Sequence, residues 1–438
     1  MQDLILRIRN FIVTKSSNQK VKQVALLYSV NLIGIPIGIV TSIIVTRYLG
    51  AELYGDYRFL NNIFSLAILI FSFGIFQAGN RALVLNNDKE KAKEYYGAEL
   101  LLVLILFLVM SAFLLLYGTY DTNLSEKGLS SFFIQLIPFG FLFVLLRYFE
   151  VLFQADNKIS LLAASRLWPK VGFLLATLII YFFLKEIPLN RHAVIWSLFL
   201  LTKAVVFFII IVRVKPSFKN IKERLKEIWN YNKSFGLQVY FGSLMAVGFS
   251  QLTGILISYF GIDNAGVGYY SLAITFAAPL ALIPNVIATT HYKDFSTRKR
   301  IPKKLFLATL GLSLAALFAL WLIIPPFIRF FYGPEFEPVI RLNLIVSTGV
   351  ALHGLADLFN RFLGAHGKGK ALRNSSFVVG FSLMTFNLLL IPKWGATGAA
   401  ITKISTGAIY AGIIIMYYLR LIKELNKLKD KKISTSEL

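Results

Sequence analysis

The chain has 438 residues, of which 56% are hydrophobic and only 16% charged, and its formal net charge is +24. It contains no cysteine, which excludes disulfides and thiolate chemistry. Its longest polar stretch, near 213–233, is too short for a soluble domain, and the sequence has no phosphate-binding loop of the G-x-x-x-x-G-K-[ST] type. ATP-driven export by this chain is therefore not expected, nor is any bound cofactor.

Apolar runs long enough to cross a bilayer as helices fill most of the chain. In chain order the predicted spans lie near 24–45, 59–79, 98–120, 130–152, 161–183, 193–212, 236–259, 267–290, 305–328, 339–358, 375–391 and 397–419. Three further stretches, 4–12, 219–232 and 421–429, have the basic amphipathic pattern of helices that lie on a membrane surface. For 219–232, a solvated linker is the alternative.

The lysines and arginines predict the orientation of these spans. Most of the 46 fall on alternate connections, which the positive-inside rule assigns to the cytoplasm together with both termini. Those assigned to the outer side are Arg47, Arg58, Lys127, Lys185, Arg191, Arg329 and Lys393. The positive net charge is thus a signal of membrane topology, reinforced by anionic lipid at the inner surface, and nucleic-acid binding is not predicted.

An internal repeat predicts how the spans are grouped. The sequence YLGAELYG at 48–55 matches YFGIDNAG at 259–266, and QADNK at 154–158 corresponds to GAHGK at 364–368. Two shorter pairs follow in the same order: Ile187-Pro188 with Ile391-Pro392, and Thr202-Lys203 with Thr402-Lys403. Each half therefore holds six spans, and an even number of spans gives both halves the same topology.

The predicted fold class is an all-α polytopic membrane protein. Its twelve transmembrane helices would form two six-helix bundles, related by a pseudo-two-fold axis along the membrane normal. The expected divisions are an N-terminal lobe at 1–212, a cytoplasmic amphipathic tether at 213–235 and a C-terminal lobe at 236–438. Rocking of the two lobes would give alternating access to a cavity between them.

Three loop motifs resemble those of polysaccharide flippases. They are RYLGAELYGDY at 47–57, NRFLGAHGK at 360–368 and LIPKWGATGAA at 390–400. Over essentially its whole length the chain resembles the Wzx family of O-antigen and capsule repeat-unit translocases. That family belongs to the superfamily that also holds multidrug-and-toxin extruders and lipid II flippases.

The resemblance implies a function, a location and partners. The substrate would be undecaprenyl diphosphate carrying an oligosaccharide repeat unit, moved from the inner to the outer leaflet of the bacterial cytoplasmic membrane. The protein would not be an enzyme. Membrane lipids would surround it, and a polysaccharide polymerase and a chain-length regulator are further partners of such a pathway.

Basic residues within the spans indicate where such a substrate would bind. A Lys or Arg at the bilayer centre costs ~2.5–3.5 kcal/mol, so these side chains must snorkel, pair or face water. Phosphate oxygens are natural partners for guanidinium and ammonium groups, and an aromatic ring could stack on a sugar. The candidate substrate-binding residues are Arg166, Lys170, Lys203, Lys403, Arg147 and Trp168.

Four residues are candidates for gating or coupling: Arg147, Glu150, His353 and Asp357. Arg147 and Asp357 occupy equivalent places in the two halves and could pair across the cavity. The alternative is local pairing, of Arg147 with Glu150 and of Asp357 with Arg361. His353 lies one turn from Asp357, where it would be a proton relay or a hydrogen-bonded packing residue. No cluster of metal-ligand type is present, so no metal site is expected.

Two alternative function classes make different demands on the sequence. A multidrug or cation antiporter of the same superfamily would need carboxylates lining the cavity, and only Glu150 and Asp357 lie deep in the predicted spans. A membrane-embedded glycosyltransferase or ligase would need catalytic residues beside a sizeable external domain. The short predicted outer loops disfavour that class.

Overall fold

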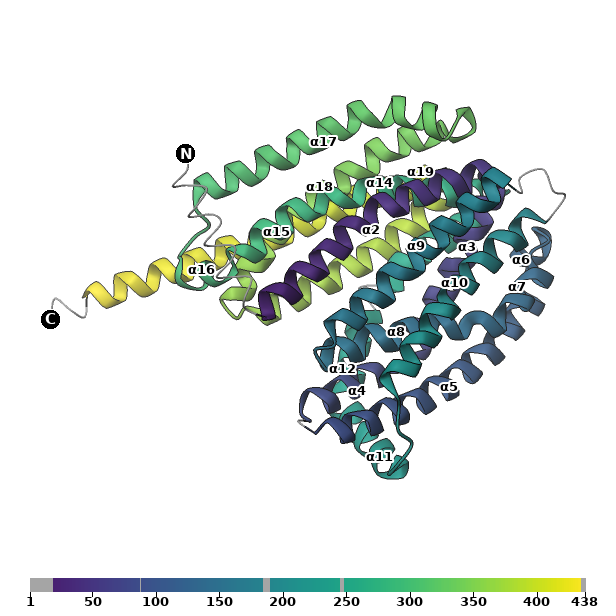
Figure 1. The fold of residues 1–438 in the computed structure, drawn as a ribbon. Coiled ribbons are helices and arrows are strands. Elements are labelled where there is room, and N and C mark those ends of the chain that lie inside the picture. The colour runs from purple at the N-terminus through teal and green to yellow at the C-terminus, as the bar shows by residue number, and fades with distance from the viewer. Residues whose placement is uncertain (1–18, 87, 184–189, 245–247, 435–438) are drawn as a thin grey trace, which may run out of the picture. The chain divides into compact units, whose positions relative to one another are not determined.

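The computed structural model describes residues 19–86, 88–183, 190–244 and 248–434, and the regular elements in these ranges are helices (Figure 1). The chain divides into two compact units: Met1–Leu49 with Phe64–Gly242, and Gly50–Ile63 with Ser243–Leu438. Residues Gly50–Ile63, expected in the N-terminal lobe, thus group with the second unit. The predicted lobes and tether stay a prediction.

The first unit is built from helices that follow one another with short connections. They are α2 (Gln19–Leu49), the end of α3 (Ala51–Phe71), α4 (Ile75–Val84), α5 (Lys89–Tyr120), α6 (Thr122–Glu126), α7 (Ser130–Leu136), η1 (Ile137–Phe139), α8 (Gly140–Ala155), α9 (Ile159–Phe183), α10 (Arg191–Val214), α11 (Ile221–Tyr231), the π-helical η2 (Asn232–Gly236) and α12 (Leu237–Ser243). Its long helices α5, α8, α9 and α10 run side by side (Figure 1).

The second unit contains the remaining helices. They are α13 (Phe249–Phe260), α14 (Ala265–Ala277), η4 (Ala278–Ala281), α15 (Leu282–Thr290), α16 (Tyr292–Thr297), α17 (Lys303–Phe331), η5 (Pro334–Phe336), α18 (Pro338–Ala365) and α19 (Gly369–Ser434). The longest of them, α19, is bent at Gly395, where φ is 53° and ψ is −131°. This bend falls between the predicted spans 375–391 and 397–419.

Within the described residues, nine helical stretches are long and apolar enough to cross a membrane. A tenth arises if α3 and α4, which meet at a bend of 63°, count as one span. The predicted span 59–79 is therefore two helices rather than one, because Phe73 and Gly74 between them adopt left-handed φ values of 42° and 78°. The protein is a multi-pass membrane protein, and the count of twelve spans stays a prediction.

Aromatic packing holds α8 against α10 in the first unit. Phe149 stacks on Phe153 with ring centroids 5.1 Å apart, and it meets Phe207 of α10 edge-on at 5.2 Å. These three rings are almost fully buried. Because lipid is as apolar as these side chains, close van der Waals contact rather than removal from water holds such helices together.

The two segments of the sequence repeat contact each other within the second unit, where the start of α3 meets the turn before α14. A Cβ added to Gly55 of α3 would lie 1.8 Å from the backbone oxygen of Asn264, so the two segments touch through their main chains. The side chain of Asn264 donates a hydrogen bond to Asp56 at 2.7 Å, and Glu335 accepts one from the Ala51 N–H at 2.8 Å. These contacts explain why residues 50–63 group with the second unit.

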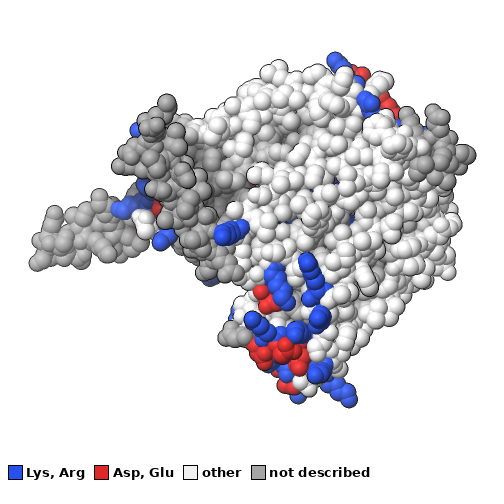
Figure 2. Space-filling view, in the orientation of Figure 1, with Lys and Arg blue, Asp and Glu red and all other residues white. Residues whose placement is uncertain are grey.

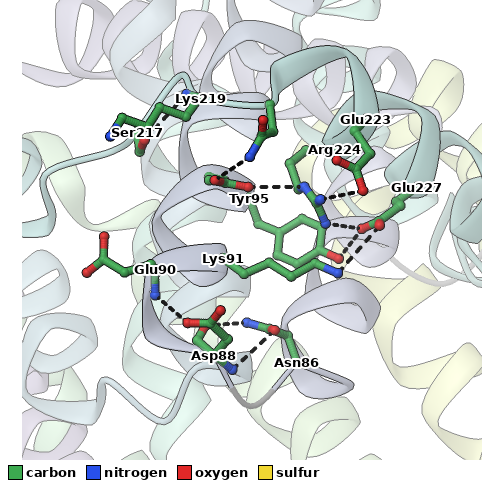
Figure 3. Close-up of polar contacts among 12 residues, drawn as sticks. Asn86, Asp88, Glu90, Lys91, Tyr95, Ser217, Lys219, Glu223, Arg224 and Glu227 are labelled. Carbon is green, nitrogen blue, oxygen red and sulfur yellow. Dashed lines mark hydrogen bonds and ion pairs between the residues drawn. The ribbon is translucent and has the colours of Figure 1, made fainter.

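The predicted surface helix at 219–232 is present as α11, and it packs against α4 and α5 of the first unit. Arg224, whose side chain is only 6% exposed, forms ion pairs with Glu94, Glu223 and Glu227 at 3.2, 2.7 and 2.8 Å (Figure 3). Trp229 remains exposed. One face of α11 is therefore fixed to protein rather than free in the interface.

Charged side chains gather at the end of the first unit that holds α11, whereas much of the rest of its visible surface is uncharged (Figure 2). This separation is typical of a protein whose ends meet water and whose sides meet lipid. Of the other two predicted surface helices, 4–12 lies outside the described residues. The stretch 421–429 continues α19 as helix.

Substituting Arg224 with alanine is expected to destabilise the first unit by about 3 kcal/mol, because three carboxylates would lose their shared, largely buried partner. The measurement is the thermal midpoint of the purified protein in detergent. Lys222→Ala is the matched control, since Lys222 lies on the exposed face of the same helix. An unchanged midpoint for Arg224→Ala would show that α11 is not held by this cluster.

The same cluster gives an expected pH dependence. Burial alone would raise the pKa of Glu227, but the hydrogen bond from Tyr95 and the charges of Arg224 and Lys91 together lower it. A carboxyl with a lowered folded-state pKa stabilises the fold above its unfolded pKa of about 4.3, and this stability is lost as the pH falls through the lowered value. We expect Glu227→Gln to reduce the difference between thermal midpoints at pH 7 and pH 4.

Candidate functional site

Four helices of the first unit, α2, α8, α9 and α10, enclose a pocket of about 450 Å³. Its charged lining residues are Glu150 from α8, Arg166 and Lys170 from α9, and Lys203 from α10. The structure thus brings together three cations that the sequence singled out separately. With one carboxylate among them, the formal charge of the lining is positive.

Helix α9 contributes two of the cations because their spacing places them on one face. Arg166 and Lys170 are one turn apart, and Pro169 between them also lines the pocket. A Cβ added to Gly34 of α2 would lie 3.3 Å from the Lys170 ammonium. The glycine therefore allows α2 to approach the head of this lysine.

Lys203 lies at the middle of α10 and is only 8% exposed. Its ammonium sits 4.0 Å from the ring centroid of Phe143 and 3.7 Å from that of Phe199. In the described part of the chain no carboxylate lies within ion-pair distance of it. The two aromatic faces stabilise the cation by roughly 0.5–2 kcal/mol each without neutralising it, so its charge is available to a ligand.

Glu150 is shared between two arginines. Its carboxylate lies 3.1 Å from Nε of Arg166 and 3.8 Å from a terminal nitrogen of Arg147. Arg147 therefore makes the local ion pair with Glu150, which was the alternative to pairing with Asp357 of the other half. It is not among the residues that line the pocket. Arg166 lines the pocket with its charge partly balanced, unlike Lys203.

Trp168 does not line this pocket, and its predicted contact with the substrate stays a prediction. It is 57% exposed and lines a separate, mostly apolar groove together with Val171 and Leu175. The reason is helical geometry: Trp168 is two residues from Arg166 and from Lys170, which turns it roughly 200° away from either.

Lys403, the repeat-mate of Lys203, belongs to α19 of the second unit. The contact of α18 with α19 is close here, since a Cβ added to Gly349 would lie 2.6 Å from the Lys403 carbonyl oxygen. The first-unit pocket does not include Lys403. Its predicted role in substrate binding stays a prediction.

His353 and Asp357 of α18 are connected through a residue that the sequence did not single out. Tyr410 of α19 donates a hydrogen bond to Asp357 at 2.8 Å, and its ring stacks on His353 with centroids 4.3 Å apart. Asn360 donates to the same tyrosine hydroxyl at 2.7 Å. Coupling through His353 and pairing of Asp357 with Arg147 both stay predictions.

Sequence reasoning overlooked Glu99, which it placed at the edge of a span. The side chain is fully buried in the first unit, and in the described residues neither carboxyl oxygen has a hydrogen-bond partner of good geometry. It packs on Gly79 of α4, where a Cβ would lie 1.8 Å from the carboxyl. The sequence signal for its burial was that an apolar run follows Glu99 directly.

Among the described residues no group of three or more metal-binding side chains occurs.

Residues 21–292 match the family described as polysaccharide biosynthesis protein. The chain belongs to this family. A capsular polysaccharide biosynthesis protein, CapF of Staphylococcus aureus, is 24% identical over 361 residues, which are 77% of this chain and 84% of CapF. The resemblance recognised in the loop motifs is thus confirmed.

Two solved structures show the same fold. A lipid II flippase, MurJ, in an inward closed conformation has a TM-score of 0.69 at 15% identity, covering 92% of this chain and 91% of that one. An inward-facing multidrug resistance MATE family transporter has a TM-score of 0.67 at 15% identity, covering 90% and 96%. The helices that line the cationic pocket of this polysaccharide biosynthesis protein lie within residues 21–292, which match the family, except for the first two residues of α2.

Proposed function

We propose that this protein flips undecaprenyl-diphosphate-linked oligosaccharide repeat units from the inner to the outer leaflet of the bacterial cytoplasmic membrane. Translocation proceeds by alternating access and involves no covalent step. The observation that supports the proposal is the first-unit pocket, in which Arg166, Lys170 and Lys203 face a single carboxylate. The predicted orientation, with both termini in the cytoplasm, belongs to the same proposal.

A diphosphate is the chemical group that this pocket fits best. The planar guanidinium of Arg166 can bind two phosphate oxygens at once, and the two ammonium groups bind as point charges. Lys203 has aromatic rings around it but no counter-ion among the described residues, so an incoming anion supplies its missing partner. The volume of about 450 Å³ lies within the range of small-molecule sites.

The rival function, export of cationic drugs, requires the opposite charge. The one carboxylate of the pocket, Glu150, is already engaged by Arg166 and Arg147. A positively charged drug would meet two ammonium groups on entering. The likeness to a multidrug transporter concerns the fold and does not favour this alternative.

The test is a flipping assay with the purified protein in proteoliposomes. A fluorescent polyprenyl-diphosphate oligosaccharide is present in both leaflets, and a membrane-impermeant quencher reports how much of it becomes accessible. We expect protein-dependent exposure of the inner pool, and competition by a diphosphate-bearing lipid but not by its uncharged analogue. Transport of a cationic dye without movement of the lipid would support the antiporter instead.

In cells, loss of the protein is expected to leave lipid-linked repeat units on the inner leaflet. A polymerase and a chain-length regulator would act on the flipped product, which makes them proposed partners. In the second unit, Lys403 is proposed to contact the substrate. His353 and Asp357 are proposed to act in coupling.

A further inference from the structure

Helix α5 carries a buried carboxylate that the proposed mechanism does not use. Glu99 lies ten residues after Lys89, the first residue of α5, which is about 15 Å along the helix from the end assigned to the cytoplasm. In the ranges that the structure describes, neither oxygen of this fully buried side chain has a hydrogen-bond partner of good geometry. Buried polar groups are nearly always hydrogen-bonded, so this exception requires an explanation.

Two other carboxylates that lie deep in the predicted spans do have partners. Glu150 forms an ion pair with Arg166 at 3.1 Å, and Asp357 accepts a hydrogen bond from Tyr410 at 2.8 Å. A cation or a donor compensates each of these groups for the water that it loses on burial. Glu99 lacks such compensation within the described part of the chain.

The groups that face Glu99 come from α4 and α8. On α4, a Cβ added to Gly79 would lie 1.8 Å from a carboxyl oxygen of Glu99, so the carboxyl packs directly on this helix. On α8, Tyr148 lies close enough to interact with the charge of Glu99. The Tyr148 hydroxyl, however, donates its hydrogen bond to the backbone oxygen of Tyr96 at 2.9 Å.

The charges on the other elements that pack against α5 lie elsewhere. Helix α11 pairs with α5 through Glu94 and Tyr95, at least one turn before Glu99. The segments α7 and η1 contain no titratable residue. Asp156, at the end of α8, accepts a hydrogen bond from the Tyr96 hydroxyl at 3.0 Å. Among the described residues, no lysine, arginine or histidine lies within ion-pair distance of Glu99.

Helix α4, which covers Glu99, begins at a break in the helical path. Phe73 and Gly74 have left-handed φ values of 42° and 78°, and α3 and α4 meet there at 63°. Residues 50–63 of α3 belong to the second unit, whereas α4 belongs to the first. In the rocking cycle proposed above, movement of the second unit reaches α4 through this bend. A break of this kind acts as a hinge, so the packing of α4 on Glu99 changes during the cycle.

We propose that Glu99 is a proton-binding site, and that its proton is exchanged in each flipping cycle as α4 packs on the carboxyl and moves away. An ionised carboxylate shut away from water without a partner is costly, so the packed arrangement holds the neutral acid. When α4 moves away, the O–H bond breaks, the proton passes to water from the cytoplasmic side and the carboxylate is hydrated. The role in flipping rests on the proposed function, whereas proton binding is measured separately.

A proton fits this site better than a metal cation does. Hard cations such as Ca²⁺ and Mg²⁺ require about six or more oxygen ligands. Glu99 provides one carboxylate, and within the described ranges it belongs to no group of three or more metal-binding side chains. The contact with Gly79 also leaves no space for a hydrated ion between the carboxyl and α4.

The first experiment detects the proton directly by infrared spectroscopy of the purified protein in liposomes. A neutral carboxyl has a carbonyl stretching band that a carboxylate lacks. At pH 7 we expect this band in the difference spectrum between wild type and Glu99→Gln. The difference spectrum for Glu90→Gln should lack it, because Glu90 is an exposed carboxylate at the start of the same helix. Carboxylate bands alone in the Glu99→Gln difference spectrum would overturn the proton assignment.

The second experiment measures flipping in proteoliposomes with the same pH on both sides. We expect the wild-type Vmax to rise from pH 5 to pH 8, because release of the proton lets α4 move. Glu99→Gln has no proton to release, so its Vmax at pH 8 should fall at least tenfold and should not depend on pH. Its KM should stay within twofold of the wild-type value, because Glu99 does not line the cationic pocket.

Two further variants serve as controls for this measurement. Glu99→Asp keeps a titratable carboxyl and should retain the pH dependence, and Glu90→Gln should follow the wild type. A Glu99→Gln variant with the wild-type Vmax and pH profile would overturn the role in flipping and identify Glu99 as a neutral packing residue. Wild-type protein that shows the neutral carboxyl band but flips no lipid would instead overturn the proposed function.

Gly79→Ala tests the site without changing the carboxyl itself. The added methyl group would meet the end of the Glu99 side chain, which can rotate away, so the variant is expected to fold. We expect the neutral carboxyl band at pH 7 to be lost, because α4 no longer packs on the carboxyl. Gly38→Ala is the matched control, since a Cβ there meets no atom within 4 Å. An unchanged band in Gly79→Ala would show that contact with α4 does not hold the proton.

Discussion

Replacing Lys203 with methionine is expected to lower the initial rate of substrate flipping about 10- to 100-fold. Methionine keeps an apolar chain of similar length between Phe143 and Phe199 and removes the charge. A hydrogen bond to a charged group contributes about 1.5–3 kcal/mol, and no other cation of the pocket lies so deep without a carboxylate partner among the described residues. Alanine at Lys203, Arg166 and Lys170 together should abolish flipping.

Two controls separate loss of the site from loss of the fold. Lys203→Arg keeps the charge and should restore part of the activity, whereas Lys226→Met on the exposed face of α11 should leave the rate unchanged. Each variant must reach the membrane in wild-type amount and show a wild-type elution profile in detergent. Full activity of the triple alanine variant would rule out binding of the diphosphate in this pocket.

Substituting Gly55 with alanine is expected to prevent the second unit from folding. The added methyl group would lie 1.8 Å from the Asn264 backbone oxygen, which cannot rotate away as a side chain could. Overpacking in well-packed interiors costs about 1–3 kcal/mol, and a clash with main chain exceeds that range. The hydrogen bond from Asn264 to Asp56 would be lost as the two segments move apart. The measurement is the yield and thermal midpoint of the detergent-solubilised protein.

The matched control is Gly412→Ala in α19 of the same unit. A Cβ there meets no atom within 4 Å, so alanine should be neutral or should stabilise the helix by roughly 0.5–1 kcal/mol. The Asp56→Asn variant should fall between the two, because it weakens the hydrogen bond and keeps the close packing. A wild-type midpoint for Gly55→Ala would show that α3 and the backbone of Asn264 are not in main-chain contact.

The two repeat segments were recognised in the sequence, but the physical reason for their pattern was not. The repeat was visible because YLGAELYG and YFGIDNAG share spacing, and it was interpreted as evidence for two similar halves. The structure adds the reason for one of these glycines: α3 packs at Gly55 on the backbone of Asn264. Spacing along the chain carries no information about which segment another segment touches.

The sequence singled out the cations of the first-unit pocket, but it placed them at a cavity between two lobes, and that cavity stays a prediction. Arg166 and Lys170 share one helix face by their spacing, and Lys203 is a charge in the middle of an apolar run. That all three line one pocket depends on how α9 and α10 are rotated against each other. The position of Trp168 has the same origin, because the helix turns it away from its charged neighbours toward an apolar groove.

The contacts of polar and charged side chains that are buried within the protein were the hardest to predict from the sequence. Arg224 lies in the segment 219–232, whose composition predicted a helix on the lipid surface. Its side chain is nevertheless buried among three carboxylates from α5 and α11. Glu99 was placed at a span edge and is fully buried on Gly79. Tyr410 links His353 to Asp357 from another helix. In each case the partner is distant in sequence or on a neighbouring element.

Hydrophobic length and the distribution of charge, both properties of local sequence, determined that this is a helical membrane protein, and the loop motifs placed it in its family. Tertiary structure alone decided which cations meet, which carboxylate they share and where the apolar groove lies. The physical reason is that transfer into lipid acts on each segment separately, whereas a binding site depends on the relative rotation and depth of several helices.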